Sequence, residues 1–360
     1  MDSIVSRLAA VNIFAWVIYS AVSSFIPIYL SESGYSEAQI GLIFAVGALV
    51  MLARPFFSLL ADWWGRRRLT QISILSGSLS YIAYTVNAYA GKFLEYVYSA
   101  TWVLRSAIVD ACPKRELNSV LANLNGTEVL AYGCGMVLGG IVIGYLGFSQ
   151  TFYIAAVLNF LLIFFIPRFR ERTAHEVMRV DWNFSKPLLI VSLLSLAWGV
   201  GHGITTVIVP LIYSDFFQLD IVRIGAFVSI VEVVHALPLM VLKKRLDSHD
   251  ARMLAIFSSL IIIPVSALLF MTRIFPTFYL LTLLVSAVYA FFPTALDRLV
   301  VDASRKKFLA FDMSITTTTY SLGLGIGALL VGPVVGTFGL FGAYLVEVVQ
   351  GLLIIGLLFI

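Results

Sequence analysis

SLLADWWGRRRLT, residues 58–70, places three arginines, an aspartate and a glycine between two long apolar runs. The chain around it has 360 residues, of which 60% are hydrophobic and only 12% are charged, and its mean hydropathy is +0.96. A soluble protein of this size needs many more charges to cover its exterior. The few charges are concentrated in short segments, and residues 58–70 form one of the most distinct of them.

The apolar runs recur along the whole chain and predict an all-α integral membrane protein. A helix needs about 20 apolar residues to cross a bilayer, and only a helix satisfies its own backbone groups there without forming a closed barrel. We expect the first run to be retained as a span, because no small-residue cleavage site follows it. The twelve expected spans are 8–30, 38–61, 69–90, 93–112, 119–146, 149–167, 187–213, 224–242, 253–272, 277–301, 310–336 and 339–360.

Lysine and arginine are distributed unevenly over the loops between these spans. With the N-terminus inside, the inner loops hold 18 of the 24 basic residues, whereas the outer loops hold 3, namely Lys92, Arg223 and Arg273. Basic residues favour the cytoplasmic side of a membrane protein. We therefore expect a multi-pass protein of the cell membrane with both termini in the cytoplasm, and residues 58–70 form a cytoplasmic loop.

The two halves of the chain resemble each other. The longest charged stretch, RFRERTAHEVMRVDWNFSK at 168–186, separates an N-terminal segment, 1–167, from a C-terminal segment, 187–360. Pro27 matches Pro210 at an offset of 183 residues, and Asp110 matches Asp302 at an offset of 192. Six spans repeated in the same orientation form a parallel repeat. The repeat predicts two pseudo-symmetric six-helix bundles joined by a central cytoplasmic loop.

In this context, residues 58–70 resemble the loop signature of the major facilitator superfamily, G-x-L-a-D-r-x-G-r-r. Ser58 replaces the usual glycine and Trp63 the usual basic residue. The resemblance extends to the span number, the central loop and the repeat. It implies a secondary transporter and not an enzyme, with spans 1, 4, 7 and 10 around a central cavity. The matching residues are Leu60, Asp62, Gly65, Arg66 and Arg67.

The resemblance also implies that this loop is a conformational latch at the cytoplasmic side. Asp62 ends a helix at the membrane boundary, Arg66 one turn later pairs with it, and Asp110 at the end of span 4 shares that arginine. Gly65 allows a sharp turn between the spans. Each such contact is worth about 1–3 kcal/mol where water is partly excluded. The alternative is a solvated basic loop whose arginines only set the topology.

Charged residues inside the spans need a reason, because each costs about 2.5–3.5 kcal/mol at mid-bilayer. Glu128 lies in span 5, and Glu232 and His235 lie three residues apart on one face of span 8. In the family fold these two spans meet. A carboxylate in apolar surroundings takes up a proton near neutrality, so these three residues are candidates for proton coupling. Alternatively, they form buried bonds between helices, as we expect for Glu347 in span 12.

Aromatic and polar residues on spans 1, 4, 7 and 10 are candidates for a solute-binding cavity. For each aromatic residue, core packing or anchoring at the membrane interface is an equal alternative. Three further charged residues lie nearer the cytoplasmic ends of spans 4 and 10 and suit a gate, namely Arg105, Asp297 and Arg298. The cavity candidates are Asn12, Trp16, Tyr19, Tyr98, Trp102, Trp198, His202 and Tyr289.

The glycine series GCGMVLGGIVIG at 133–144 resembles the antiporter signature of the family, although Met136 stands where proline is expected. Close helix packing explains the glycines equally well. Together with the sparsely charged aromatic cavity, the series favours export of a small amphipathic organic solute over uptake of a sugar or organic acid. A polytopic membrane enzyme acting on lipids is the rival class, and LDSHDARM at 246–253 is its nearest polar cluster.

Cofactors and macromolecular partners are not expected. Cys112 and Cys134 form no ligand pattern, and no phosphate loop, metal cluster or nucleophile constellation occurs. The basic residues form no stripe with aromatic residues, which argues against nucleic acid. We expect a monomer in the lipid bilayer, with a small molecule and protons as its only other partners.

The topology can be tested directly. A reporter inserted near Ala174 in the central loop, and one at each terminus, should all report a cytoplasmic location, because the basic residues place these segments inside. Accessibility to a membrane-impermeant label in intact cells is the measurement. An external signal at any of the three positions would overturn the twelve-span interpretation.

Overall fold

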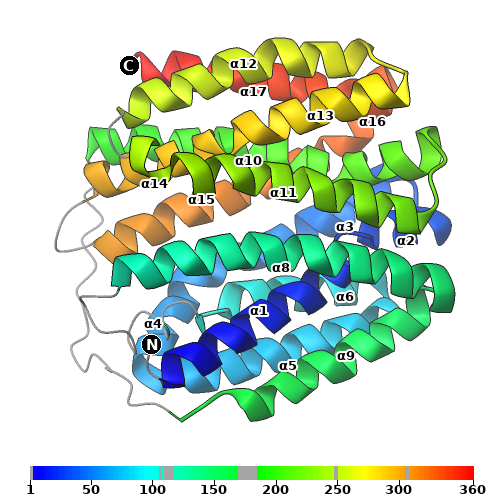
Figure 1. The fold of residues 1–360 in the computed structure, drawn as a ribbon, viewed down its shortest axis with the longest axis vertical. Coiled ribbons are helices and arrows are strands. Elements are labelled where there is room, and N and C mark those ends of the chain that lie inside the picture. The colour runs from blue at the N-terminus through cyan, green and yellow to red at the C-terminus, as the bar shows by residue number, and fades with distance from the viewer. Residues whose placement is uncertain (1–2, 105–107, 109–116, 169–184, 247–249, 305–308) are drawn as a thin grey trace. The chain divides into compact units, whose positions relative to one another are not determined.

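The computed structural model describes residues 3–104, 108, 117–168, 185–246, 250–304 and 309–360 (Figure 1). Every regular element in these residues is a helix. In the first half of the chain they are α1 (Ser3–Ser23), α2 (Ile26–Glu32), α3 (Glu37–Val50), the 3₁₀ turn η1 (Met51–Ala53), α4 (Arg54–Trp64), α5 (Arg66–Tyr84), α6 (Ala88–Thr101), α8 (Leu117–Leu146) and α9 (Phe148–Phe165).

The second half continues in the same way. Its elements are α10 (Lys186–Leu211), the π-helical segment η2 (Ile212–Phe216), α11 (Ile221–Leu246), α12 (Ala251–Met271), α13 (Phe275–Tyr289), α14 (Phe291–Ala303), α15 (Leu309–Leu329), α16 (Val331–Phe338), the 3₁₀ turn η3 (Leu340–Gly342) and α17 (Ala343–Leu358).

Within the described residues, nine helical stretches are long and apolar enough to cross a membrane. A tenth is formed if α15 and α16, which are bent by 41° at their junction, make one broken span. Each of the twelve expected spans overlaps a helix or a pair of consecutive helices. However, α6 has only 14 residues and α5 begins with three arginines. The chain is thus a multi-pass helical membrane protein, and the count of twelve stays a prediction.

The boundary between the third and fourth expected spans lies earlier than the sequence predicted. α5 ends at Tyr84 and α6 begins at Ala88, because Asn87 caps α6 by accepting a hydrogen bond from the backbone N–H of Ala90 at 3.0 Å. Lys92, predicted to lie in an outer loop, is therefore inside α6 and is only 2% exposed. The N-cap asparagine starts the helix more than one turn before the apolar run begins.

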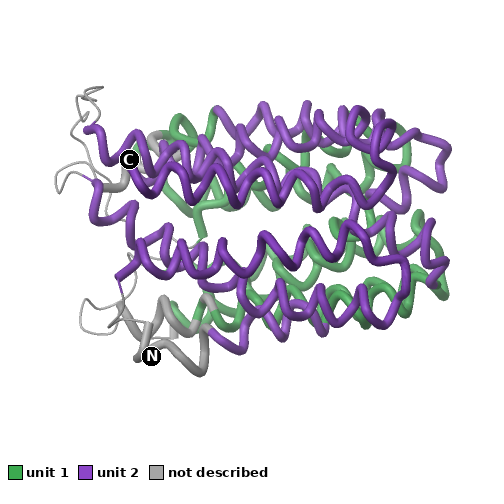
Figure 2. Tube along the Cα trace, turned by 90° about the horizontal axis from the view of Figure 1, so that it is seen from above, with its two compact units in different colours: residues 1–26, 53–181, 220–229 green, residues 27–52, 182–219, 230–360 purple. Residues whose placement is uncertain are grey.

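The described helices belong to two compact units, which Figure 2 distinguishes by colour. Unit 1 contains Met1–Ile26, Ala53–Asp181 and Asp220–Ser229, and unit 2 contains Pro27–Leu52, Trp182–Leu219 and Ile230–Ile360. Each unit takes most of its residues from one half of the chain and a shorter segment from the other half. The division into two six-helix bundles at 1–167 and 187–360 stays a prediction.

In unit 1, α1 packs on α8 and α9, and α5 packs on α6 and α9. α5 is polar for a membrane helix, but its serines are buried inside the protein. Ser73 and Ser76 donate hydrogen bonds to backbone carbonyls of α6 at 2.7 and 2.8 Å, and Asn159 of α9 donates to the carbonyl of Ile74 at 2.8 Å. Small residues at helix contacts and polar side chains bonded between helices are typical of membrane interiors.

In unit 2, α10 packs on α15 and α17, and α12 packs on α13, α14 and α17. Buried apolar side chains from α10, α12, α14 and α17 form one core, which includes Leu194 and Phe292. α3 packs on α15, where Gly41 lies against the carbonyl of Ala328. A helix from the first half of the chain is thus anchored on the second half within this unit.

Glycines set the closest helix contacts in both units. In unit 1, a Cβ atom added at Gly139 of α8 would lie 2.6 Å from the Cα of Ala21 in α1. In unit 2, a Cβ added at Gly323 of α15 would lie 2.9 Å from the Cα of Gly199 in α10. On another face of α8, Gly140 lies against Ile221 and Gly225 of α11. Close packing therefore accounts physically for the glycine series.

A matched pair of glycine substitutions on α8 should have opposite effects on the stability of the folded protein. Gly139→Ala places a methyl group against the α1 backbone, and overpacking of this kind costs about 1–3 kcal/mol. Gly126→Ala meets no described atom within 4 Å and should stabilise the helix by about 0.5–1 kcal/mol. The measurement is the apparent melting temperature of the purified protein. Equal shifts for the two variants would contradict the packing assigned to Gly139.

Candidate functional site

An aromatic cluster in unit 1 combines residues of α1, α6 and α8. The rings of Trp16 and Tyr19 meet edge to face with centroids 5.7 Å apart. Trp16 also lies 6.0 Å from Tyr132, and Tyr19 lies 6.0 Å from Tyr98. Tyr98 in turn lies 5.2 Å from Trp102 just after α6. The structure therefore brings four predicted cavity residues together, and it adds Tyr132, which the sequence analysis missed.

Asn12, one turn before Trp16 on α1, forms a polar contact with α8. Its side chain is fully buried, and its amide nitrogen donates to Glu128 Oε1 at 2.7 Å. Hydrogen bonds to an ionised acceptor are shorter and stronger than neutral ones. A predicted cavity residue and a predicted coupling residue thus lie in direct contact inside unit 1.

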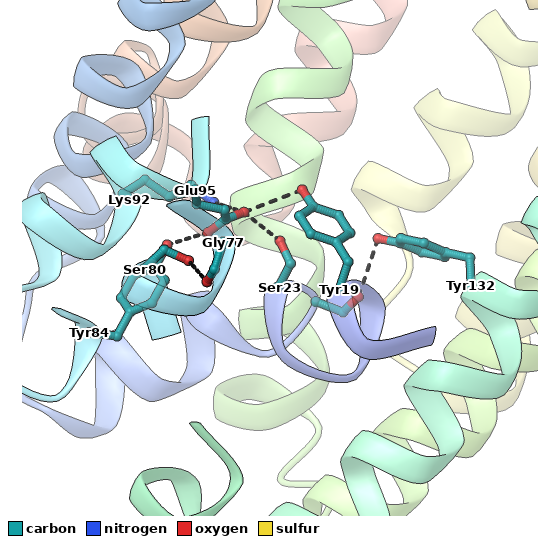
Figure 3. A network of polar contacts seen from close by, with 9 residues as sticks. Tyr19, Ser23, Gly77, Ser80, Tyr84, Lys92, Glu95 and Tyr132 are labelled. Carbon is teal, nitrogen blue, oxygen red and sulfur yellow. Dashed lines mark hydrogen bonds and ion pairs between the residues drawn. The ribbon is translucent and has the colours of Figure 1, made fainter. Parts of the chain in front are cut away.

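A second polar network in unit 1 is centred on Glu95 of α6 (Figure 3). Glu95 Oε1 accepts hydrogen bonds from Ser23 Oγ at 2.7 Å, from Lys92 Nζ at 3.0 Å and from the Tyr19 hydroxyl at 3.3 Å. Glu95 Oε2 accepts from the Tyr84 hydroxyl. Both members of the Lys92–Glu95 ion pair are 2% exposed.

This network was not predicted from the sequence, for two reasons. Lys92 was expected in a loop, and Glu95 had no predicted role although it lies inside the fourth expected span. One signal was available: Glu95, Tyr98 and Trp102 are spaced by three and four residues, which puts them on the same face of a helix. The face that carries two predicted cavity residues therefore also carries a carboxylate.

Unit 2 contains a cluster of the same kind, built on α10. The ring of Trp198 lies 6.2 Å from His202 on the same helix, 6.2 Å from Tyr289 of α13 and 4.6 Å from Tyr320 of α15. The indole N–H of Trp198 donates to the Tyr289 hydroxyl. His202 lies 6.0 Å from Tyr320. Three predicted cavity residues thus come together, and Tyr320 joins them.

The two clusters are related by the internal repeat. The glycines of α8 and α15 correspond at a constant offset of 188 residues, from Gly135 to Gly323 and from Gly139 to Gly327, and the same offset carries Tyr132 to Tyr320. This offset is a signal by which both tyrosines could have been found from sequence. The other equivalent pairs are Trp16 with Trp198 at 182, Tyr19 with His202 at 183, and Tyr98 with Tyr289 at 191.

The coupling candidates of α11 lie beside the unit 2 cluster. His235 is half-buried and its ring lies 6.5 Å from that of Tyr289. Glu232, three residues earlier, is also half-buried. Ser286 of α13 donates to the carbonyl of Val231 at 2.9 Å and ties the two helices together. Glu128 belongs to unit 1 and these residues to unit 2, so their meeting stays a prediction.

Glu347 faces a neighbouring helix, as predicted. It lies on α17, is 9% exposed and accepts a hydrogen bond from Ser266 of α12 at 2.8 Å. One turn later on α17, the side chain of Gln350 lies against Gly201 of α10. α17 thus packs on α12 and α10 in unit 2, with the Ser266–Glu347 hydrogen bond joining it to α12.

The latch and gate candidates are described only in part. Asp62 lies in the last turn of α4 and Arg66 is the first residue of α5. Gly65 between them has φ = +100° and ψ = +135°, a conformation that favours glycine, so the sharp turn is present. Arg105 and Asp110 lie outside the described residues. Asp297 and Arg298 are exposed on α14 and line a pocket of about 320 Å³ beside α12.

The two clusters offer stacking surfaces, hydroxyl groups, an indole N–H and nearby carboxylates. Such groups bind a small organic molecule by stacking and hydrogen bonding. No group of three or more metal-ligating side chains lies together in the described part of the chain. The long apolar helices and the polar clusters buried among them define a multi-pass membrane protein with a candidate site for a small organic molecule in each unit.

The chain belongs to the Major Facilitator Superfamily, whose family model matches residues 8–234. This membership points to a transporter rather than an enzyme. The resemblance noted in the sequence is thereby confirmed. No curated protein sequence matches the chain.

Several solved transporters share the fold. The human organic anion transporter MFSD10 (TETRAN) aligns with a TM-score of 0.75 at 15% identity, over 99% of this chain and 98% of its own. The nucleoside transporter NupG gives 0.75 at 16% identity, over 99% and 98%. A bacterial homologue of the human lysosomal transporter Spinster, in an inward-facing and occupied conformation, gives 0.76 at 12% identity, over 99% and 95%. At these identities the likeness establishes the fold alone.

The contact between Asn12 and Glu128 can be measured with a double-mutant cycle. Asn12→Ala and Glu128→Ala should show a coupling energy of about 1–3 kcal/mol, because the amide donates to a half-buried carboxylate. The apparent free energy of unfolding, obtained by titrating the purified protein with sodium dodecyl sulfate, is the readout. As a control, Asn159→Ala should be additive with Glu128→Ala within about 0.5 kcal/mol. Additivity of the Asn12 pair would refute the contact.

Proposed function

We propose that this protein is a secondary transporter of the cell membrane that moves a small organic solute by alternating access. The supporting observation is the pair of aromatic clusters, one in each unit, related by the internal repeat. Family architecture assigns both clusters to cavity-lining spans, because Trp16 and Trp198 lie in spans 1 and 7 and Tyr98 and Tyr289 lie in spans 4 and 10. The proposal includes twelve spans, two six-helix bundles at 1–167 and 187–360, and the linker 168–186.

The composition of the clusters supports a solute with a planar or apolar part and a few polar groups. Aromatic faces bind planar groups, and the hydroxyl and indole groups fix the orientation of a polar part. MFSD10 and NupG are named as transporters of organic anions and of nucleosides, and both solute classes are small and organic. We propose an amphipathic organic solute and favour export.

We further propose that protons drive the cycle through Glu128 or Glu232. Both carboxylates lie in helices of the membrane region, where an ionised group needs a partner or a proton. Asn12 links Glu128 to α1 and hence to Trp16, whereas His235 links the Glu232 region to Tyr289. Taking up or releasing a proton at either carboxylate would change the polar contacts beside a solute cluster. This is the local change that coupling requires.

The loop 62–66 is proposed as the cytoplasmic latch. The sharp turn at Gly65 places Arg66 at the start of α5 directly after the last turn of α4, which carries Asp62. An ion pair across this turn that forms in the outward-open state alone would bias the conformational equilibrium without adding to the stability of the other state. Asp110 is proposed as its third member.

Flux through reconstituted vesicles tests the proposed function. Wild-type protein in proteoliposomes, given a metabolite mixture and an imposed pH gradient, should change the internal amount of at least one small organic solute, as measured by mass spectrometry. Vesicles without protein are the control. Absence of any flux would contradict transport, and chemical change of the vesicle lipids would favour the rival class of membrane enzyme.

The coupling proposal predicts a selective defect. Glu128→Gln or Glu232→Gln should abolish solute accumulation driven by a pH gradient, because a glutamine side chain cannot take up and release a proton during the cycle. Exchange of solute down its own gradient should survive. One proton crossing about 100 mV supplies about 2.3 kcal/mol, or roughly fifty-fold accumulation, so the loss is measurable. If both variants still concentrate solute as the wild type does, these carboxylates only tie helices together.

A further inference from the structure

Glu95 joins three helices of unit 1 through one carboxylate. Its two oxygens accept hydrogen bonds from Tyr19 and Ser23 of α1, from Tyr84 of α5 and from Lys92 of its own helix. Figure 3 shows these side chains converging on the carboxylate. Glu95 therefore connects α1 to α5 and α6.

The four partners suit an acceptor that has two oxygens, as a carboxylate has. All four partners act as donors, and a protonated carboxylic acid would itself be a donor with less acceptor capacity. Lys92 supplies the opposite charge at 3.0 Å, and its ammonium also lies 5.2 Å over the ring of Tyr96. Without this charge, a buried carboxylate would be uncompensated. Lys92 therefore allows the Glu95 carboxylate to accept hydrogen bonds from Tyr19 and Ser23 of α1.

The position that corresponds to Glu95 in the second half of the chain holds a neutral residue. The offset of 191 residues that relates Tyr98 to Tyr289 relates Glu95 to Ser286. Ser286 ties α13 to α11 through a neutral hydrogen bond. Buried ion pairs contribute little net stability compared with apolar side chains of similar size. The charges in unit 1 therefore call for a role beyond folding.

Tyr19 connects Glu95 to the aromatic cluster. Its hydroxyl donates to Glu95, while its ring contacts Trp16 on one side and Tyr98 on the other. Tyr98 lies one turn after Glu95 on the same face of α6. The hydrogen bond at its hydroxyl and the two ring contacts together fix the direction of the Tyr19 ring.

We infer that Glu95, with Lys92 as its counter-charge, is a positioning residue that fixes α1 and the Tyr19 ring in the solute cluster. This role rests on the proposed function only in that the cluster binds a solute. The charged pair acts through Tyr19 and touches no solute itself. Ser23 and Tyr84 complete the set of donors around the carboxylate and hold it in place.

A spectroscopic probe at Tyr19 tests the inference without any solute. The full chain, with 3-fluorotyrosine incorporated at position 19, is placed in lipid nanodiscs and its ¹⁹F resonance is recorded. Glu95→Gln and Lys92→Met should each shift or broaden this resonance, because the hydroxyl loses its charged acceptor or the acceptor loses its counter-charge. An unchanged resonance in Glu95→Gln would overturn the inference.

A charge-free double variant separates positioning from simple stabilisation. Lys92→Met combined with Glu95→Leu leaves no uncompensated charge, so the melting temperature should return toward that of the wild type. The Tyr19 resonance should stay displaced, because the acceptor is gone. Recovery of both signals would show that the pair is only structural. Glu347→Gln, a change at a buried carboxylate of unit 2, should leave the Tyr19 resonance unchanged.

A transport arm uses the solute that wild-type vesicles carry fastest. Glu95→Gln should raise its half-saturation concentration about tenfold, which corresponds to the loss of one hydrogen bond to a charged group, while the maximal rate changes less. An unchanged half-saturation concentration would contradict the positioning role. If wild-type vesicles move no solute, the proposed function fails, and the ¹⁹F arm still decides whether Glu95 positions Tyr19.

Discussion

The close approach of α1 to α8, and of α10 to α15, controls where the functional groups of each unit lie. Lipid supplies no hydrophobic force between helices, so tight contacts depend on small residues that let backbones meet. Gly139 and Gly323 provide them, since a Cβ atom at either position would collide with the facing helix. The same two contacts bring Trp16 to Tyr132 and Trp198 to Tyr320. Helix packing and cluster geometry therefore have a common cause.

The two units share their aromatic framework but differ in their charges. The repeat preserves a tryptophan on α1 and α10 and a tyrosine on each of the facing helices. It does not preserve two of the carboxylates. The counterpart of Glu95 is Ser286, at the offset of 191, and the counterpart of Glu128 is Thr316, at the offset of 188. Buried charge in a membrane is costly and has to be matched by partners. Unit 1 provides those partners on α1, α5 and α6, which makes it chemically distinct from unit 2.

The sequence by itself determined the class of protein and its family. The length of an apolar run and the placement of basic residues are local properties, and the bilayer imposes both directly. The loop signature around Asp62 and Gly65 could also be identified from the sequence, because a sharp turn between helices requires a glycine. Periodicity on one helix also grouped Asn12, Trp16 and Tyr19 correctly, since residues three and four apart share a face whatever the helix packs against.

Only the tertiary structure decided which side chains from distant segments meet. The rotation of each helix about its axis depends on packing partners, and no local pattern specifies it. Asn87 moved the start of α6 and turned Lys92 from a loop residue into a buried one. Glu95 gained its role because Tyr19 and Ser23, more than seventy residues earlier, reach it from α1. Contacts of this kind exist only once the helices have packed together.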